Sequence, residues 1–197
     1  MRIATALLFV GMVIIQWAVP AGMIFNTHRI LKEGTTYRFR TQPVDPADPF
    51  RGNYLHLNFP SPMVITDTLK HYEEDEVAYV SLKADSLRFA YPFDIQKEKP
   101  ANTDGYLKLR VRYAAVSPDT SQARQSVYLE YPFDKMFLEE SKASDAEQAY
   151  WNSRNDSVES YVVVKVLDTD AVLVDVIVND SSVVDIVKRM RIGNRLP

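Results

Sequence analysis

Hydrophobic and polar positions divide the chain into two parts with different patterns. From residue 3 to residue 25 no side chain is charged, and the polar members are Thr5 and Gln16. As a helix, this run would be about 34 Å long at about 1.5 Å per residue, slightly longer than a hydrocarbon core of about 30 Å. A soluble helix needs a polar stripe, and this run has none. The pattern predicts one transmembrane helix that contacts the lipid bilayer through residues 3–25.

A cleaved signal peptide is the competing interpretation of this segment. Arg2 supplies a short basic start, and Ala18 and Ala21 are small residues of the kind found near a cleavage point. The apolar region of a signal peptide spans about 7–15 residues, and the longer run here favours a retained anchor. Arg29 and Lys32 follow the run while Arg2 precedes it, so the flanking charges leave the orientation open. A short N-terminal tail commonly stays in the cytoplasm, which would place the large domain outside.

Beyond the anchor the dominant period is two, which is typical of strands with one buried and one exposed face. Between Tyr106 and Tyr113 apolar and basic residues alternate strictly, with Tyr113 on the apolar face. Two runs rich in β-branched residues, 161–167 and 171–178, are separated by Asp168-Thr169-Asp170, which predicts an antiparallel hairpin. Further strands are predicted at 37–41, 54–59, 77–82, 87–90, 127–131 and 182–187.

The fold class predicted from these patterns is mainly β. We expect an N-terminal transmembrane anchor at 1–27 and an extracytoplasmic domain at 28–197 with an antiparallel β-sandwich-like or barrel-like fold. Residues 144–154 are compatible with a helix, because Ser144 and Glu147 have the spacing of a capping box, and equally with a surface loop, because the segment is only weakly amphipathic. The acidic run at 73–76 is expected to be a solvated loop.

Composition narrows the chemistry. The net charge is -3, which gives no support to a nucleic-acid partner. The chain has no cysteine, which excludes disulfides, thiolate zinc sites, iron–sulfur clusters and a cysteine nucleophile. His28, His56 and His71 lack the spacing of metal ligands. We therefore predict no metal site and no cofactor.

A cell-envelope hydrolase stays open as an alternative. Ser61 with Lys70 or Lys83 could act as a Ser–Lys pair, although the flanking residues do not resemble enzymes that use one. No Gly-x-Ser-x-Gly motif occurs, and the spacing of paired catalytic carboxylates is a property of the folded chain. The sequence assigns no catalytic residue.

The most distinctive passage spans 43–59. Its three prolines, at 43, 46 and 49, hold the backbone extended, and Gly52-Asn53 then favours a turn. Loop residues such as Asp45, Asp48 and Arg51 usually stabilise their own loop through hydrogen bonds, and two carboxylates three residues apart do not form a metal site without further oxygen ligands. A recognition surface is the remaining option. Its predicted members are Asp45, Asp48, Arg51, Gly52, Asn53, Tyr54, His56 and Asn58.

The segment from Gly52 to Phe59 resembles the motif of the GDYXXLXY family, small membrane-anchored bacterial proteins. Gly52, Tyr54 and Leu57 match the motif in place, whereas Asn53 stands where the family name has Asp and Phe59 where it has the last Tyr. The resemblance implies an extracytoplasmic β domain, on the periplasmic side of the inner or plasma membrane, with no established activity. It also implies a polytopic membrane protein as partner.

Two classes of binding function remain besides the hydrolase. The first is a non-enzymatic, membrane-anchored accessory or interaction module that positions its recognition surface beside a membrane partner. The second is a sensor of a small ligand or glycan, which would have an aromatic-lined groove built from Tyr54, Phe59, Tyr91 or Tyr131.

Overall fold

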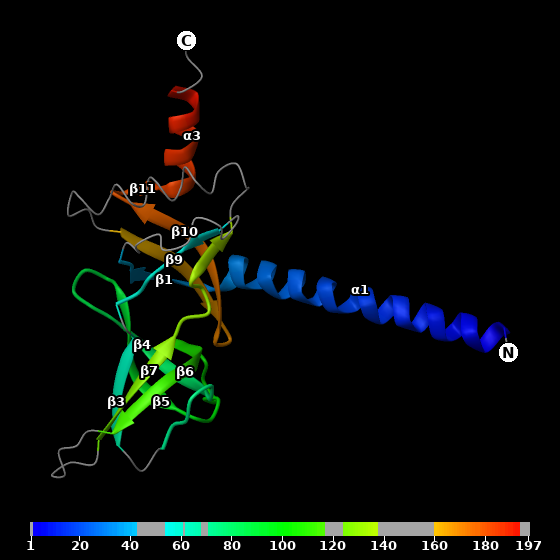
Figure 1. Cartoon of the computed structure of the whole chain (residues 1–197), viewed down its shortest axis with the longest axis horizontal. Coiled ribbons are helices and arrows are strands. Elements are labelled where there is room, and N and C mark those ends of the chain that lie inside the picture. Colours follow the sequence, from blue (N-terminus) through cyan, green and yellow to red (C-terminus); the bar gives the residue numbers. More distant parts are fainter. Residues whose placement is uncertain are drawn as a thin grey trace.

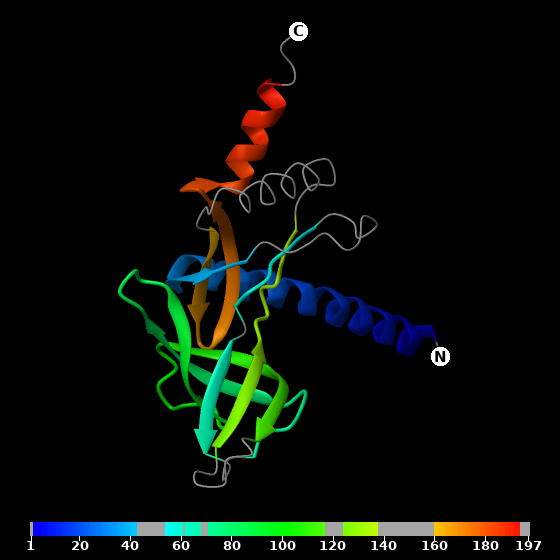
Figure 2. The ribbon, with the colours of Figure 1, turned by 60° about the vertical axis from the view of Figure 1, so that its left-hand side comes forward.

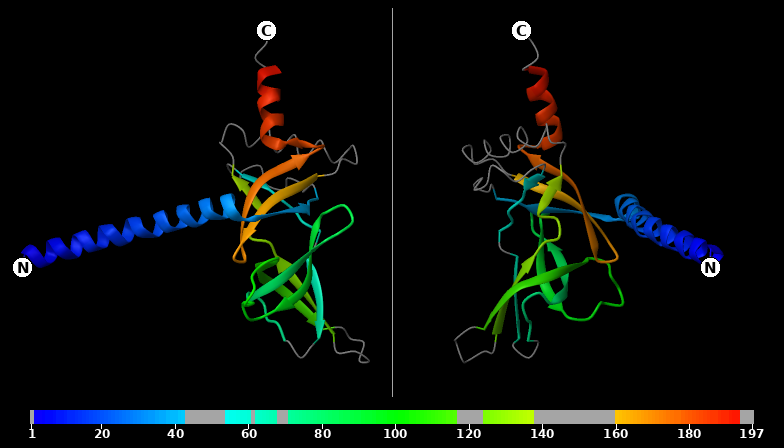
Figure 3. Two further views of the ribbon diagram at one scale, coloured as in Figure 1. Left: turned by 180° about the vertical axis from the view of Figure 1, so that it is seen from behind. Right: turned by 45° about the vertical axis from the view of Figure 1, so that its right-hand side comes forward.

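The computed structural model describes residues 2–42, 54–60, 62–67, 71–116, 124–137 and 160–193. Within these ranges a long helix, α1 (Arg2–Glu33), leads into a β-rich body, and a shorter helix, α3 (Val183–Gly193), follows the last strand (Figure 1). Helix α1 leaves the side of the body, between its two ends (Figures 1 and 3). The predicted class, mainly β with one N-terminal apolar helix, is confirmed.

Helix α1 is long and apolar enough to span a membrane. Its apolar window is not buried against the rest of the protein, as expected of a helix that faces lipid. The helix continues past the predicted span to Glu33, and Pro20 lies inside it. Arg29 and Glu33 form an ion pair at 3.4 Å one turn apart, and the amide of Gly34 donates to the carbonyl oxygen of Ile30 at 2.9 Å where the helix ends.

The first sheet lies beside the end of α1. It is antiparallel, in the order β1 (Thr35–Arg40), β9 (Ser160–Leu167), β10 (Asp170–Val178) and β11 (Ser181–Ser182). The predicted β9–β10 hairpin is confirmed. Its two turn residues, Asp168 and Thr169, have φ of 51° and 76°, which is the left-handed geometry that matches the twist of a two-residue hairpin.

The second sheet has five strands and curls into a nearly closed barrel. Its order is β3 (Met63–Asp67), β7 (Arg124–Glu130), β6 (Tyr106–Val116), β4 (Val77–Ala84) and β5 (Ala90–Gln96), and its two edge strands approach each other. A two-stranded ribbon of β2 (Tyr54–His56) and β8 (Lys135–Phe137) accompanies it. The barrel and the first sheet follow one another along the body (Figure 2), and the Lys108 amide joins them by donating to the Thr169 carbonyl at 2.8 Å.

The alternation predicted along β6 holds until a bulge. Leu107, Leu109 and Val111 are buried, but Tyr113 is 47% exposed, so its predicted place on the buried face is wrong. The β6–β7 register shifts between Val111 and Tyr113, which reverses the faces of the residues that follow. Ala114 then packs against the core in its place.

Two predicted strands are wrong. Residues 85–89 form a turn, because Asp85 Oδ1 accepts the amides of Leu87 and Phe89 at 2.9 Å each, and β5 begins only at Ala90. Residues 183–187 belong to α3, whose buried Val183 and half-buried Ile186 have helical spacing. The segment at 144–154, predicted as a helix or a surface loop, lies outside the described residues.

Candidate functional site

Most of the predicted recognition surface lies outside the described residues. Asp45, Asp48, Arg51, Gly52 and Asn53 are not described, and for Tyr54 only the backbone, at the start of β2, is described.

The strand predicted at 54–59 has one buried and one exposed face, as its period of two predicts. The side chains of His56 and Asn58 are exposed, while Leu55 and Leu57 are each 2% exposed. The Asn58 carbonyl accepts the Gln42 amide at 2.8 Å, which connects the end of the motif to the residue that follows β1 and Thr41. The alternation of the motif strand is therefore confirmed, and its role in recognition stays a prediction.

An aromatic cluster lies where the motif strand ends. The ring of Tyr131 packs against Phe39, Phe59 and Phe133 with centroid distances of 5.1, 4.9 and 5.0 Å. Ring pairs at such distances stabilise a core beyond the area they bury. Burial raises the pKa of the Tyr131 phenol above its ordinary value, so this side chain stays neutral.

A groove of about 360 Å³ is built over this cluster. Phe59, Tyr91 and Tyr131, three of the four aromatic residues predicted for a ligand groove, line it. Phe39 and Phe89 complete its aromatic wall, and neither had been singled out. The structure therefore brings together side chains from β1, the β2–β3 connection, β5 and the residue after β7.

The polar rim of the groove is an ion pair held in place by backbone. Arg40 Nη2 lies 3.2 Å from Asp85 Oδ2, and the guanidinium carbon lies 4.4 Å from the Phe89 ring centroid. Because Asp85 Oδ1 already accepts two backbone amides, the carboxylate is oriented before any ligand arrives. Strand β1 begins just after α1 and ends at Arg40, so this polar rim lies about 20 Å along β1 from α1 at about 3.3 Å per residue.

A second cavity, of about 540 Å³, lies between the end of α1 and the β body. Asn26, Thr27 and Ile30 of α1 line one side of it. The other sides carry charges of both signs. These charged residues are Lys108, Arg110, Glu130, Asp134, Lys135 and Asp170. The sequence offered no signal for this cavity, because its walls come from five separate segments.

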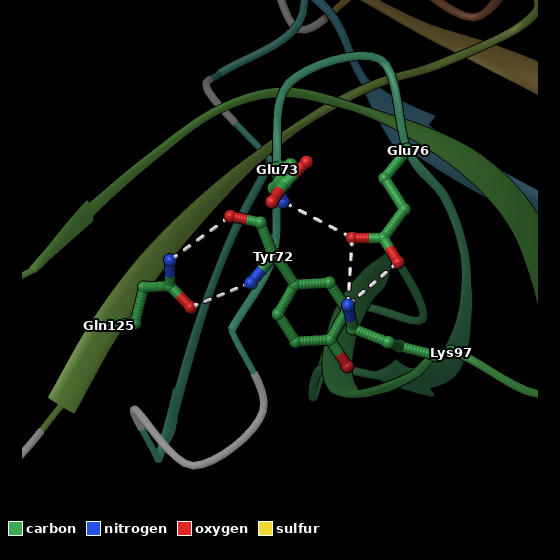
Figure 4. Close-up of polar contacts among 5 residues, drawn as sticks. All are labelled: Tyr72, Glu73, Glu76, Lys97 and Gln125. Carbon is green, nitrogen blue, oxygen red and sulfur yellow. Dashed lines mark hydrogen bonds and ion pairs between the residues drawn. The ribbon is translucent and has the colours of Figure 1, made fainter.

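The acidic run at 73–76 is an exposed turn, as predicted for a solvated loop, and one end of it is held by Lys97 (Figure 4). Lys97 Nζ lies 2.8 and 3.1 Å from the two carboxylate oxygens of Glu76, and the Glu73 amide donates to Glu76 at 3.1 Å. The hydrogen bond from Lys97 lowers the pKa of Glu76. The Lys97 ammonium also lies 5.2 Å from the centroid of the Tyr72 ring, so this ion pair covers Tyr72.

Tyr72 is the anchor of this turn. Its amide donates to Gln125 Oε1 at 3.2 Å and its carbonyl accepts Gln125 Nε2 at 3.3 Å (Figure 4). The side chain is 2% exposed, and its hydroxyl has no hydrogen-bond partner in the described part of the chain. Burial, followed by the nearby charges of Glu76 and Asp94, raises the pKa of Tyr72 to about 12. This cluster stabilises the barrel and offers no reactive group.

The other candidate chemistry is only partly described. Ser61 and Lys70 lie outside the described residues, and the Lys83 ammonium lies over the Phe93 ring, 3.1 Å from its centroid. His28, His56 and His71 are all exposed. Among the described residues no group of three or more His, Asp or Glu side chains is placed to hold a metal ion.

Comparison with known proteins agrees with the motif. The family model described as GDYXXLXY protein matches residues 16–176, from the second half of α1 to β10. Comparisons with curated proteins and with solved structures found no match. Because the family model covers most of the chain, including the motif strand, the second sheet and all of the first sheet before residue 177, the chain belongs to the GDYXXLXY family.

Proposed function

We propose that the protein is a membrane-anchored accessory module of the bacterial cell envelope. Helix α1 holds the β body on the periplasmic side of the inner membrane, and the body binds a membrane partner through the aromatic groove and the 43–58 segment, which precedes Phe59 in the sequence. The observation that carries this proposal is the direct packing of the anchor onto the body.

The junction between anchor and body has the character of a core contact. Ile30 of α1 is 3% exposed, and Arg29 Nη2 lies 3.1 Å from Asp168 Oδ2 in the β9–β10 turn. The Lys165 ammonium donates to the Leu31 carbonyl. Only Gly34 separates α1 from β1. A body docked in this way keeps its groove at a set height above the bilayer, which raises its effective concentration for a membrane partner.

The lining of the groove favours binding over catalysis. Its charged members among the described residues are Arg40 and Asp85, which are paired with each other. None of the described lining residues is a serine, threonine, histidine or lysine, so a Ser–Lys pair is not supplied there, and Asp85 is the one carboxylate among them, where paired-carboxylate catalysis needs two. Aromatic side chains with an Arg at the rim are the composition of binding hot spots.

Co-purification tests the partner surface. The full chain is cross-linked in native membranes and recovered as the wild type, as Tyr91→Ala, as Arg51→Ala and as the control Phe93→Ala. Tyr91 lines the groove and is 43% exposed, whereas Phe93 is 52% exposed on the same strand and does not line it. We expect Tyr91→Ala and Arg51→Ala to lose partner recovery and Phe93→Ala to keep it. Equal recovery from all four would refute this surface.

The side of the membrane is tested by labelling. Because the chain has no cysteine, Lys99→Cys provides a single thiol on the exposed β5–β6 connection. A membrane-impermeant maleimide added to intact spheroplasts should label it fully. Labelling only after lysis would place the body in the cytoplasm, and recovery of the chain in the soluble fraction would rule out the anchor.

A small-ligand or glycan sensor is the second candidate, favoured by the groove itself. Its volume of about 360 Å³ falls within the about 300–1,000 Å³ of typical ligand sites. The exposed ring of Tyr91, in the same groove as the Arg40–Asp85 pair, suits a ligand ring that carries hydroxyl groups. Calorimetric titration of the full chain in micelles with a set of neutral disaccharides should show binding that Tyr91→Ala removes. The absence of heat with every sugar would end this candidate.

A further inference from the structure

We propose that the charged cavity between α1 and the β body binds the headgroup of a zwitterionic phospholipid, one that carries a phosphate and an ammonium group. The inference rests on the membrane anchoring proposed above. Three independent features support it: the depth of the cavity, the side of the body on which it lies, and the balance of its charges.

The cavity lies at the depth of lipid headgroups. Ile30, which lines it, is five residues after Phe25 at the end of the apolar run. This separation is about 7.5 Å along a helix at about 1.5 Å per residue. A bilayer of about 40–45 Å with a hydrocarbon core of about 30 Å has a headgroup layer about 5–8 Å deep on each side. The α1 wall of the cavity therefore falls within that layer.

The body lies alongside the bilayer when α1 crosses it. Helix α1 leaves the side of the body, with the barrel toward one end and α3 toward the other (Figures 1 and 3). An upright α1 therefore turns that side of the body toward the lipid surface. The cavity is on this side because its lining includes Asn26 and Thr27 of α1. The aromatic groove is lined by Phe39 and Arg40 at the far end of β1, and it shares Tyr131 with the cavity.

The charges that line the cavity cancel. Lys108, Arg110 and Lys135 supply three cations, and Glu130, Asp134 and Asp170 supply three carboxylates. A purely anionic headgroup would meet as many carboxylates as cations. A zwitterion satisfies both signs at once, with its phosphate near the cations and its ammonium near the carboxylates.

Several of these charges are available to a ligand. Within the described part of the chain the side chains of Lys108, Glu130 and Asp170 make no ion pair or hydrogen bond, and all three are exposed. Arg110 lies opposite Glu130 on the neighbouring strand, and its contact with Asp75 is a solvent-exposed pair at 3.4 Å, which is worth little.

The walls of the cavity are held by buried contacts. The hydrogen bond from the Lys108 amide to the Thr169 carbonyl, 2.8 Å long, ties β6 to the β9–β10 turn, and Thr169 is buried. Ile30 is buried where α1 meets the body. The volume of about 540 Å³ is within the range of about 300–1,000 Å³ of ligand sites. The cavity is thus pre-formed.

Binding is tested with short-chain lipids that dissolve as monomers. The full chain in detergent micelles is titrated calorimetrically with dihexanoyl phosphatidylethanolamine, with dihexanoyl phosphatidylglycerol, and with glycerophosphoethanolamine, which lacks chains. We expect the ethanolamine lipid to bind most tightly. Lys108→Glu and Asp170→Lys should each weaken it about tenfold, because each replaces a charge-assisted contact by repulsion. Lys99→Glu and Glu98→Lys, exposed charges that do not line the cavity, should leave affinity unchanged.

The outcomes separate the possibilities. Unchanged affinity in the cavity variants, or tighter binding of the glycerol lipid, would overturn the proposal. Equal binding of the chain-free compound would assign the cavity to a soluble phosphate ester and would also overturn it. Matched thermal transitions of the variants and controls exclude unfolding as the cause of a loss.

The orientation is tested in vesicles with a fluorophore at a single cysteine. Asp170→Cys places the fluorophore in the lining of the cavity. Leu87→Cys places it at a side chain that is 61% exposed, in the turn near the groove. A headgroup-labelled quencher lipid should quench the first strongly and the second weakly, and equal quenching would overturn the orientation. A chain that does not bind vesicles would defeat the membrane anchoring itself. The headgroup inference alone would fail if the chain binds vesicles and partner recovery still depends on the groove, but Lys108→Glu and Asp170→Lys leave the affinity for lipid unaltered.

Discussion

Replacing Gly34 by alanine should separate the anchor from the body. Gly34 is the single residue between α1 and β1, and its amide donates to the Ile30 carbonyl at 2.9 Å. A Cβ added there would lie 2.5 Å from the Ile30 carbonyl oxygen, 3.2 Å from the Val166 carbonyl oxygen and 3.2 Å from Lys165 Cβ. Two of these three atoms are backbone, which cannot rotate away. The alanine therefore has to push α1 away from β9.

The size of the effect follows from the crowding. Forcing one extra methyl group into a packed site costs about 1–3 kcal/mol. For a protein of this size each kcal/mol moves the unfolding midpoint by about 2–4 °C, which gives a fall of about 2–12 °C. Gly34 lies outside α1, which ends at Glu33, so interior helix propensity does not enter and the loss has to come from the junction.

Gly11→Ala and Gly22→Ala are the matched controls. They make the same substitution in α1, and an added Cβ meets no atom within 4 Å at either position. Thermal unfolding of the full chain in detergent micelles, followed by circular dichroism, gives the midpoint. Limited trypsin digestion reports opening at Arg29 and Lys32. If Gly34→Ala melts and digests like the two controls, the packed junction, and with it the set height of the groove, is refuted.

Four further predictions concern the turn around Tyr72. Gln125→Leu leaves the amide and carbonyl of Tyr72 without their partner and should lower the free energy of unfolding in urea by about 1–3 kcal/mol or more. Tyr72→Phe removes a buried hydroxyl that has no partner among the described residues and should unfold at the same or higher urea concentration at neutral pH. Because the pKa of Tyr72 is raised from 10.0 to about 12, the wild type should lose stability as pH rises through that window, and Tyr72→Phe should lose less; parallel alkaline curves would contradict the buried phenol. Because the pKa of Glu76 is lowered from 4.5, its contribution is present above that pH and is lost on acidification, so Glu76→Gln should flatten the acid limb of the stability curve.

The sequence predicted correctly those strands and turns whose conformation depends on residues close together in the chain. The β9–β10 hairpin followed from β-branched runs around Asp168-Thr169, since strand and turn preferences are carried by the same few residues. The faces of the motif strand followed from alternation alone. The prediction failed where the same residues fit both the period of a strand and the period of a helix. Residues 182–187 are β-branched, but Val183 and Ile186 also have the spacing of one helical face, and packing on the first sheet selected the helix.

The sequence predicted only part of the groove, because the contacts that build it are not local. Phe59, Tyr91 and Tyr131 could be singled out as aromatic residues near strand ends, but nothing local places them together. Arg40 and Asp85 are far apart in the sequence, and their pairing depends on β1 lying beside β5. The one-residue bulge before Tyr113 also cannot be predicted from alternation, because the same sequence is compatible with a strand that has the bulge and with one that lacks it.

The end of the anchor shows most clearly what hydropathy measures. The apolar run ends at residue 25, whereas the helix continues to Glu33. Residues 26–33 include polar and charged side chains, and they also bury Ile30 and pair Arg29 with Asp168 of the β9–β10 turn. The boundary predicted at 27 therefore falls inside one continuous helix. Under the anchoring that we propose, this continuity, together with the burial of Ile30 against the body, would let the anchor set the orientation of the β body.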